Sequence, residues 1–491
     1  MPHPHTPVLV GIGVAYQRVE DPSAAAEPLA LMIEAARRAV ADCGAPGIAA
    51  SIGRIGVPMG RWAYGDPARL VGQAIGACDP TTILAKVGVL QQTLLGDAAR
   101  AVAEGETEAA LVVGGDAGYR LLRAGIVGHS VTDRSDDGQP DRLLAPHEEL
   151  RHPIELRFGF KAPVGLYAII DSAFRFARSR DIETHRDALA ALYAGFSEIA
   201  AHNPHAWRRQ AVPADAIRDA AARNPMQAFP YTSRHCSSWS VDQASALLFC
   251  SMGLAERLGL RQDRFIFPLA STEANHMVPV SARATLARCP GAAIAGAAAL
   301  QMCGIAPKDL DLVEFYSCFP VAVEMVAAEL GVPPARSLTV TGGMPFAGGP
   351  YNNYVLQATC RMAELLRAGK GTTGLVGSIS GVLTKQGFGV WSRQPGEAGF
   401  ESRDVTDAVA RAMPTKEVVG GYAGPATVAG YTVLHSKNEP PSGVILADLR
   451  DGRRTMAATS DETIVTRMEA FEFCGAAATI SEDTFVCEPR G

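Results

Sequence analysis

The sequence lacks the cysteine and histidine patterns that mark metal sites and disulfide frameworks. Its ten cysteines are scattered over 491 residues without a CxxC pair, and its histidines show no metal-ligand spacing. Cysteines without such spacing are typical of reduced, mostly buried thiols. We therefore expect neither a disulfide nor a bound metal ion.

A strong charge of one sign and long apolar runs are also missing. The net charge is −6, acids and bases are interspersed, and no basic stripe indicates nucleic acid or an anionic membrane surface as a partner. The longest apolar runs are strand-sized, and the start, MPHPHTPVLVGIG, has no signal-peptide pattern. These features predict a cytoplasmic globular protein with a small-molecule or protein partner and no membrane contact.

Two glycine motifs fall short of nucleotide-binding fingerprints. GIG at Gly11 to Gly13 follows a predicted strand, but it has neither the third glycine nor the later acidic residue of a dinucleotide site. AGKGTT from Ala368 has Glu364 where a phosphate-binding loop needs its first glycine. We expect neither NAD nor ATP.

What the sequence does contain is an internal repeat. LMIEAARRAVADCGAPGIAASIGRIGV and AAIAGAAALQMCGIAPKDLDLVEF share one order of helix, Cys-Gly stop, loop and strand, and Ala35 and Cys43 have counterparts 260 residues later. A second pair of segments places Gly105 and Gly369 in matching turns, 264 residues apart. Repeated helix–strand units predict two α/β halves with buried sheets, although chance similarity between alanine-rich helices would look alike.

The remaining segments complete the predicted domain organisation. Residues 1–265 form the first half, with an inserted loop and lid region at about 120–265, and residues 266–412 form the second half. From 413 to 491, short β-rich runs separated by Asn-Glu-Pro-Pro and Asp-Gly turns predict an additional small β domain.

Glycine-bearing turns at predicted strand ends are the main candidates for a binding site. The clearest is VTGGMPFAGGP, residues 340–350, followed by a helix expected to start near Tyr351. Glycine lets backbone N–H groups approach a ligand, and a helix N-terminus favours a carbonyl oxygen or phosphate. Tight turns in a crowded core would need the same glycines.

Cysteine and histidine side chains offer weaker candidates. In VEFYSCFPVAVEM, Cys318 precedes a predicted helix, where a thiol has a lowered pKa, but a buried cysteine is inert. His235 and Cys236 are sequence neighbours, which rarely face each other correctly for catalysis, so structural roles are expected. His276 is an isolated base candidate in a predicted loop.

Taken in order, these segments resemble the thiolase superfamily. PVLVGIG is similar to its first strand, GDAARAVAEGETEAALVVGGDA to the helix and strand behind its nucleophile, VEFYSCF to its NEAF-type or HDCF-type motif, TGGMPFAGGP to GGxxxxGHP, and LVGSISGVLTKQGFG to its CxG loop. The resemblance covers residues 6–412 and implies an α/β fold with a five-layer αβαβα sandwich built from two repeated halves. Residues 413–491 would add a small β domain of OB-like type.

The departures from the thiolase pattern affect its catalytic residues. The place of the nucleophilic cysteine falls on Gly88, that of the GHP histidine on Gly349, and that of the second cysteine near Ile379. The third motif has Tyr316 in place of its Asn or His. Thiolysis needs a thiolate acyl carrier, a histidine base and a second thiol, so the resemblance implies a thiolase site without its catalytic set.

Three functions remain open on this basis. The chain is most similar to thiolase-like proteins type 1, often labelled acetyl-CoA acetyltransferases, which implies a coenzyme A thioester as ligand, no bound cofactor, and acyltransferase membership without ordinary thiolase turnover. A carbon–carbon lyase acting on a β-hydroxyacyl-CoA through Tyr316 is the alternative, because retro-aldolases of this fold carry a tyrosine there and work with an OB-fold partner. A non-enzymatic scaffold would bind CoA esters and present its C-terminal domain to a protein partner.

These hypotheses share one set of site residues, and whether the thiolase dimer persists is left open. The catalytic candidates are Tyr316, Ser380 and Tyr354. The substrate-binding candidates are Gly88, His276, Cys318, Phe319, Gly348 and Gly349.

Overall fold

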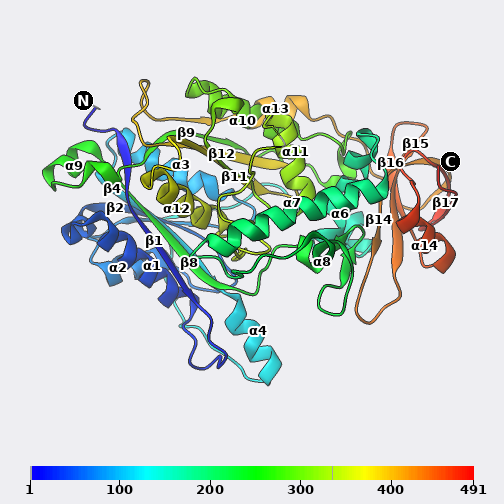
Figure 1. Cartoon of the computed structure of the whole chain (residues 1–491), viewed down its shortest axis with the longest axis horizontal. Helices are drawn as coiled ribbons and strands as arrows, with labels where there is room; N and C mark the ends of the chain where they lie inside the picture. Colours follow the sequence, from blue (N-terminus) through cyan, green and yellow to red (C-terminus); the bar gives the residue numbers. More distant parts are fainter. Residues whose placement is uncertain (1–2, 334, 491) are drawn as a thin grey trace.

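The computed structural model describes residues 3–333 and 335–490, and its first sheet is built mainly from the N-terminal half. Its order is β1-β8-β4-β2-β3-β5, and Figure 1 labels β1, β8, β4 and β2. The strands are β1 (Pro7–Gln17), β8 (Asp242–Ser251), β4 (Ala109–Ala117), β2 (Ile52–Pro58), β3 (Thr81–Ala85) and β5 (Arg142–Leu144). Strand β8 runs antiparallel to both β1 and β4, whereas β4, β2 and β3 are parallel.

The second sheet repeats this arrangement. Its order is β10-β11-β12-β9-β13, from β10 (Leu312–Glu314), β11 (Thr373–Ser380), β12 (Lys385–Ser392), β9 (Phe267–Ala274) and β13 (Glu401–Asp404). Strand β12 is antiparallel to β11 and β9, and β10 is parallel to β11. The series β2-β4-β8-β1 and β10-β11-β12-β9 therefore correspond strand by strand, in the manner expected of two duplicated halves.

Helices separate and cover the two sheets. Helix α1 (Pro28–Cys43) packs on β1 and β8, with α2 (Pro67–Ile75) beside it against β2 and β3. Helices α3 (Gln91–Ala103) and α12 (Tyr354–Arg367) contact strands of both sheets and so form the central layer. Helix α10 (Pro290–Met302) covers the outer face of the second sheet, next to α11 (Pro320–Leu330). The thiolase-like mixed α/β fold is thus confirmed.

The two glycines of GIG have a packing role in this architecture. A Cβ atom on Gly11 would lie 2.1 Å from the carbonyl oxygen of Ala39, and one on Gly13 would lie 2.0 Å from that of Ala35. Only glycine lets α1 approach β1 this closely. The motif therefore serves helix–strand contact, as expected from its incomplete nucleotide fingerprint.

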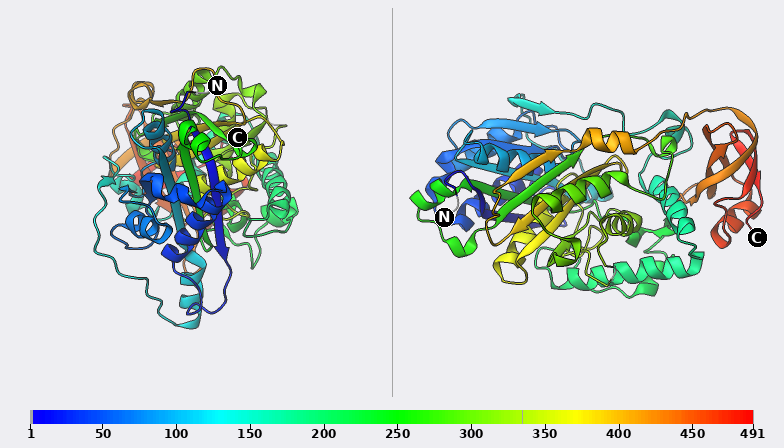
Figure 2. Two further views of the ribbon diagram at one scale, coloured as in Figure 1. Left: turned by 90° about the vertical axis from the view of Figure 1, so that its left-hand side faces the viewer. Right: turned by 90° about the horizontal axis from the view of Figure 1, so that it is seen from above.

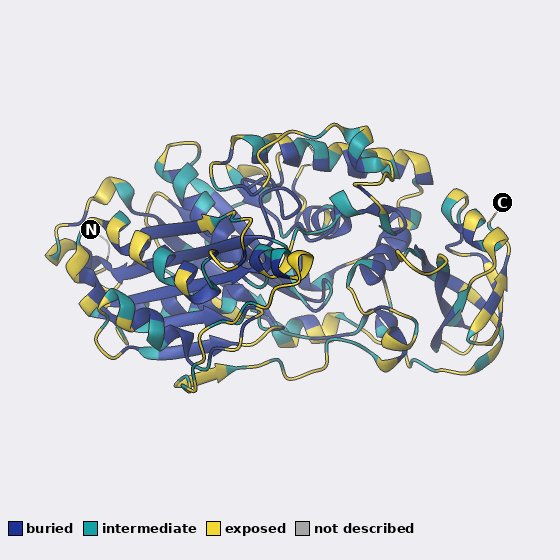
Figure 3. Cartoon of the chain, turned by 90° about the horizontal axis from the view of Figure 1, so that it is seen from below, coloured by how far each residue is buried: buried dark blue, intermediate teal, exposed yellow. Residues whose placement is uncertain are grey.

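The inserted region is smaller than the sequence indicated. Strand β8 lies within residues 120–265, yet it is the second strand of the first sheet and is buried along its whole length. Figure 3 shows buried residues in dark blue along the strands of the sheets. Its run DQASALLFCS carries no signal that separates it from the helical insertion before it. The helices before β8 are α4 (Gly118–Val127), α5 (Pro153–Arg157), α6 (Val164–Ala177), α7 (Ile182–His202) and α8 (Ala214–Arg218), and α9 (Met252–Arg257) follows it.

The C-terminal residues form a β barrel at one end of the molecule (Figure 2). Strands β14 (Tyr422–Leu434), β15 (Ser442–Leu449), β16 (Arg454–Thr459), β18 (Thr484–Cys487) and β17 (Ala477–Glu482) pair in that order, and β17 pairs back with β14. Helix α13 (Thr406–Ala412) precedes the barrel and α14 (Glu462–Ala470) follows β16.

Two short strands from the inserted region, β6 (Met226–Ala228) and β7 (Tyr231–Thr232), extend the barrel sheet beyond β14. The barrel also shares the main hydrophobic core through Val444, Leu446 and Met456. Among the described residues, no helix is long and apolar enough to cross a membrane.

Candidate functional site

A cavity of about 190 Å³ lies where loops from both halves meet. Its lining includes residues of the loop after β3, residues of the loop after β10, and residues at the end of β11. Ligands of α/β proteins bind in crevices beyond the carboxyl ends of strands, which is where these loops lie. The cavity brings together the predicted residues Gly88, Tyr316, Cys318, Phe319, Gly349 and Ser380, along with Ile379.

The other predicted site residues lie outside this lining. The Tyr354 hydroxyl is buried and donates to the Glu314 carboxylate at 2.5 Å. His276 is half-buried, and its carbonyl oxygen accepts a hydrogen bond from the Thr384 hydroxyl. Gly348 packs its backbone against Gln243, whose Oε1 would lie 2.2 Å from an added Cβ. These three residues, expected at the site, are therefore not among the residues that line the cavity.

Glu314 is the centre of a buried polar network that the sequence reading missed. Its carboxylate accepts hydrogen bonds from the backbone N–H groups of Val340 and Thr341 at 2.7 and 2.9 Å, and from the hydroxyls of Thr339 and Tyr354. Burial raises the pKa of Glu314, and these donors oppose the rise. The network fixes the loop after β10 against the glycine loop; the acid in VEFYSCF was its only sequence signal.

Gly349 stands where the resemblance places the thiolase histidine, and Ser237 occupies its side-chain space. An added Cβ on Gly349 would lie 2.1 Å from Ser237 Oγ and 3.1 Å from Met344 Cε. The Ser237 hydroxyl is inaccessible to solvent and finds no hydrogen-bond partner among the described residues. A polar hydroxyl at the cavity wall therefore replaces the expected histidine site.

Gly88 stands where the resemblance places the nucleophilic cysteine. Its φ is +103°, and an added Cβ would lie 3.0 Å from Pro146 Cγ. Its carbonyl oxygen accepts from the Ser380 hydroxyl and from the Lys385 ammonium or amine, both at 3.3 Å. The backbone at this position suits glycine, and its carbonyl is held by two polar side chains.

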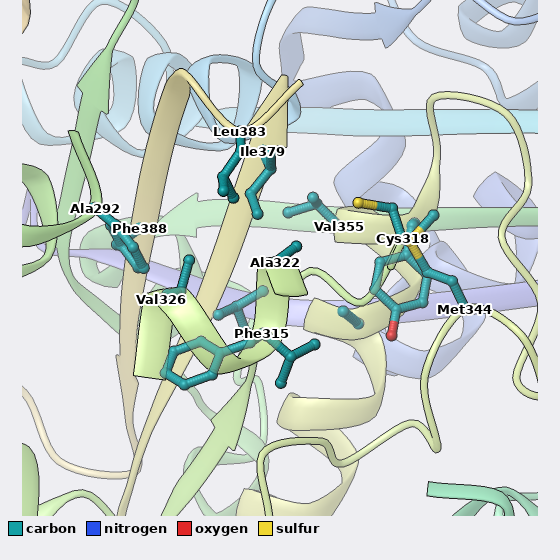
Figure 4. Close-up of a cluster of buried hydrophobic side chains, with 14 of the residues drawn as sticks. Ala292, Phe315, Cys318, Ala322, Val326, Met344, Val355, Ile379, Leu383 and Phe388 are labelled. Carbon is teal, nitrogen blue, oxygen red and sulfur yellow. The ribbon is translucent and has the colours of Figure 1, made fainter. Parts of the chain in front are cut away.

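Burial governs the protonation of the aromatic and thiol groups at the cavity. It raises the pKa of the Tyr316 phenol above its ordinary range and that of Cys318 to about 12. Burial also raises the pKa of Cys236 to about 12 and lowers that of His235 to about 3. Cys318 packs in the core beside Met344 (Figure 4), so the structure favours the inert interpretation over a lowered thiol pKa.

Several backbone N–H groups of the glycine loop, residues 340–350, donate hydrogen bonds to oxygen atoms of the protein. Gly342 and Gly343 donate their N–H groups to the hydroxyls of Thr339 and Thr341, each at 3.0 Å. The Gly349 N–H donates to the Ser238 carbonyl, also at 3.0 Å. Helix α12 begins at Tyr354, three residues later than expected from the sequence. The N–H groups of Gly342, Gly343 and Gly349 therefore bond within the protein.

Comparison with known proteins shows which proteins the chain as a whole resembles. No protein-family model matches the sequence. An acetyl-CoA acetyltransferase of Methanocaldococcus jannaschii is 31% identical over 102 residues, which cover 21% of this chain and 26% of the relative. The match thus spans about a quarter of that protein's length.

Solved structures superpose on a much larger part of this chain than the sequence match covers. A monomeric SCP2-thiolase-like protein type 1 from Mycobacterium smegmatis superposes with a TM-score of 0.82 at 25% identity, covering 100% of both chains. The Ltp2-ChsH2(DUF35) aldolase gives 0.59 at 17% identity, over 80% of this chain and 99% of that one. An acetyl-CoA acetyltransferase from Syntrophomonas wolfei gives 0.56 at 20% identity, over 79% and 99%. The chain belongs to the thiolase-like superfamily.

Proposed function

We propose that the protein binds coenzyme A thioesters in the cavity and lacks ordinary thiolase turnover. The observation that supports this proposal is the composition of the cavity wall. Gly88 and Gly349 line it at the places where the resemblance puts the thiolase cysteine and histidine, and Ser237 occupies the space of a side chain at Gly349. Cys318 lines the cavity with a thiol, but burial raises its pKa to about 12, which keeps the thiol protonated and a poor nucleophile. Neither a thiolate carrier nor an imidazole base lines the described cavity.

The cavity volume limits what it encloses. Pockets that hold drug-sized ligands measure about 300–1,000 Å³, whereas this one measures about 190 Å³. We infer that it takes the acyl end of the thioester, with the nucleotide of coenzyme A outside. Exposed Trp239, which lines the same cavity, provides an apolar surface at its rim.

A thermal-shift experiment tests binding directly. Coenzyme A, acetyl-CoA, longer acyl-CoAs and β-hydroxyacyl-CoAs are each added to the purified chain. A ligand that binds only the folded state stabilises it by RT ln(1 + [L]/Kd), about 2.7 kcal/mol at a concentration of 100 Kd. We expect a selective shift with short acyl-CoAs. Ser380→Phe, which fills the cavity, should abolish the shift, while the control Ser402→Phe at an exposed strand position should retain it.

Absence of a shift with every thioester would contradict the binding proposal. The turnover claim has its own test, in which cleavage of acetoacetyl-CoA by free coenzyme A is followed. We expect none above the uncatalysed rate. Cleavage at a normal thiolase rate would refute that part of the proposal, whatever the binding result.

A carbon–carbon lyase is the second candidate, because Tyr316 does line the cavity. The Ltp2-ChsH2 structure, an aldolase by its name, shares the fold. Since burial keeps the Tyr316 phenol protonated, it would act as a hydrogen-bond donor to the β-oxygen or enolate rather than as a free base. Under this proposal, Tyr316→Phe abolishes ketone or aldehyde release from a β-hydroxyacyl-CoA but leaves binding intact. Unchanged release in the variant would exclude the role.

We also propose that the C-terminal barrel is of the OB type and is an integral part of this chain. Its support is the closed pairing of five strands, with β16 and β18 parallel. Buried Arg454 of the barrel donates to the carbonyl oxygens of Arg283 and Ala284 in the main body. A domain anchored in this way is poorly suited to move freely, which weighs against the scaffold hypothesis. Limited proteolysis that released a folded barrel would contradict the proposed integration.

A further inference from the structure

Lys385 is a buried lysine beside the cavity that the proposed function leaves without a role. It is the first residue of β12, its exposed fraction is 2%, and its Nζ lies 3.3 Å from the Gly88 carbonyl oxygen. Within the described ranges it forms no ion pair with a carboxylate. A buried charge normally needs such a partner, so this environment favours the neutral amine. Accordingly, burial lowers the pKa of Lys385, and the more distant Glu148 opposes the shift.

Ser380 is held next to this amine by the sheet. Ser380 and Lys385 are direct cross-strand partners at the end of the β11–β12 pair. Directly opposed residues place their Cβ atoms about 4.5–5.5 Å apart on one face. The Ser380 hydroxyl also bonds the Gly88 carbonyl at 3.3 Å, and Ser380 lines the cavity. Hydroxyl and amine thus share one acceptor at the cavity wall.

The turn between these two residues has a strained backbone and is supported by hydrogen bonds from Arg283. Gly381, Val382 and Leu383 have φ values of +61°, +53° and +74°. For the β-branched Val382, a positive φ is a true outlier, and such backbone strain gathers at functional sites. Arg283 is 6% exposed, and its Nη2 donates to the carbonyl oxygens of Gly381 and Val382 at 3.1 and 2.7 Å. The buried guanidinium therefore supports the turn that connects Ser380 to Lys385.

We propose that Ser380 and Lys385 act as a nucleophile and base pair that accepts the acyl group of a thioester on Ser380 Oγ. Serine–lysine pairs perform acyl transfer on several unrelated folds. A neutral amine donates one N–H to the Gly88 carbonyl and keeps its lone pair for the serine proton. The proposal rests on the proposed function for its natural substrate, a coenzyme A thioester, and assigns the site a thioester hydrolase activity.

The steps balance with water as the only further reagent. As Ser380 Oγ attacks the thioester carbonyl carbon, its proton passes to Lys385 Nζ. The carbon–sulfur bond breaks, and the leaving thiolate takes that proton and departs as coenzyme A, which leaves an acyl ester on Ser380. Water then attacks the ester with Lys385 again as base, the carboxylic acid leaves, and the serine oxygen regains its proton.

The test uses an activated ester, so that it does not depend on coenzyme A binding. The full-length chain is incubated with p-nitrophenyl acetate; nitrophenolate release is followed, and the acetylated residue is identified by peptide mass spectrometry. We expect acylation by the activated ester to be faster than hydrolysis of the acyl-serine, so that nitrophenolate appears in a burst and an acid quench during the burst traps up to one acetyl group per chain, on Ser380. Because a general base contributes about 10²–10⁴ to such a rate, Lys385→Met should slow acetylation by that factor, and so should Lys385→Arg, whose guanidinium cannot accept the proton. Lys370→Met, at an exposed turn, is the matched control and should react normally.

The outcomes separate this inference from the proposed function. Folding of each variant is checked by circular dichroism and thermal unfolding, and Ser380→Ala should lose the adduct while keeping its fold. No adduct on Ser380, an adduct on Lys385 itself, or a Lys385→Met rate equal to that of the parent would each overturn the pair. If these occur while acyl-CoA still shifts the melting temperature, the binding proposal stands and the pair fails. An adduct on Ser380 without any acyl-CoA shift would support the pair and refute the coenzyme A ligand.

Discussion

Adding a side chain at Gly88 should destabilise the protein, because the backbone there has a conformation that favours glycine. The perturbation is Gly88→Ala, the smallest change that adds a Cβ. At φ +103° a non-glycine residue is strained by about 1–3 kcal/mol. The added atom would also lie 3.0 Å from Cγ and 3.3 Å from Cβ of Pro146. Such overpacking costs about 1–3 kcal/mol. The expected loss is thus about 2–6 kcal/mol.

The assay is denaturant unfolding followed by circular dichroism, comparing midpoints of the parent, Gly88→Ala and a matched control. The control is Gly195→Ala in α7, where an added Cβ meets nothing within 4 Å. Removing a helical glycine stabilises by about 0.5–1 kcal/mol, so the two substitutions should move the midpoint in opposite directions. Gly88→Cys, tested for acetoacetyl-CoA cleavage, should remain inactive because no histidine is among the described residues that line the cavity.

A Gly88→Ala midpoint equal to or above that of the parent would refute this reasoning. It would show that the turn tolerates a side chain and that glycine there is an incidental replacement. Thiolase turnover by Gly88→Cys would refute the stronger claim that the rest of the catalytic set is missing.

Two further predictions concern buried polar groups. The pKa of His235 falls from 6.5 to about 3 in the folded chain, so the unfolded chain binds more protons between these values; stability should fall by about 2 kcal/mol from this group between pH 6.5 and 5. His235→Asn should flatten that part of the stability–pH curve, and an unchanged slope would contradict the assignment. Tyr354→Phe removes a hydrogen bond to the buried Glu314 carboxylate and should cost about 1.5–3 kcal/mol in unfolding free energy. Its acyl-CoA thermal shift should persist, because Tyr354 lies outside the cavity lining; loss of the shift at full folding would place Tyr354 in the site.

Much of the fold was readable from local sequence pattern. The matched positions of Ala35 and Ala295, and of Cys43 and Cys303, lie on or at the ends of α1 and α10, which occupy equivalent places on the two sheets. Helical periodicity, glycine turns and buried strands are properties of short stretches, so one sequence carries them plainly. The resemblance to thiolases then pointed to six of the residues that line the cavity.

The sequence pattern did not show which strands pair with each other or in which direction a polar side chain points. Strand β8 was assigned to the insertion because its apolar run resembles any buried segment, and only pairing with β1 and β4 shows its place. Likewise, Tyr354 was a site candidate by its nearness to the glycine loop, yet helix α12 directs its hydroxyl to Glu314. Several strand pairings and side-chain orientations are compatible with the same local sequence pattern, and tertiary packing selects one of them.

The sequence by itself determined two α/β halves, a β-rich C-terminal part and a resemblance to thiolases that puts Gly88 and Gly349 at the places of the cysteine and histidine. Only the tertiary structure decided which groups meet these glycines: the Ser237 hydroxyl against Gly349, and Lys385 with Ser380 on the Gly88 carbonyl. The groups that meet at Gly88 are 292 and 297 residues away along the chain. Contacts over such separations depend on how two complete halves pack, and no local spacing encodes them.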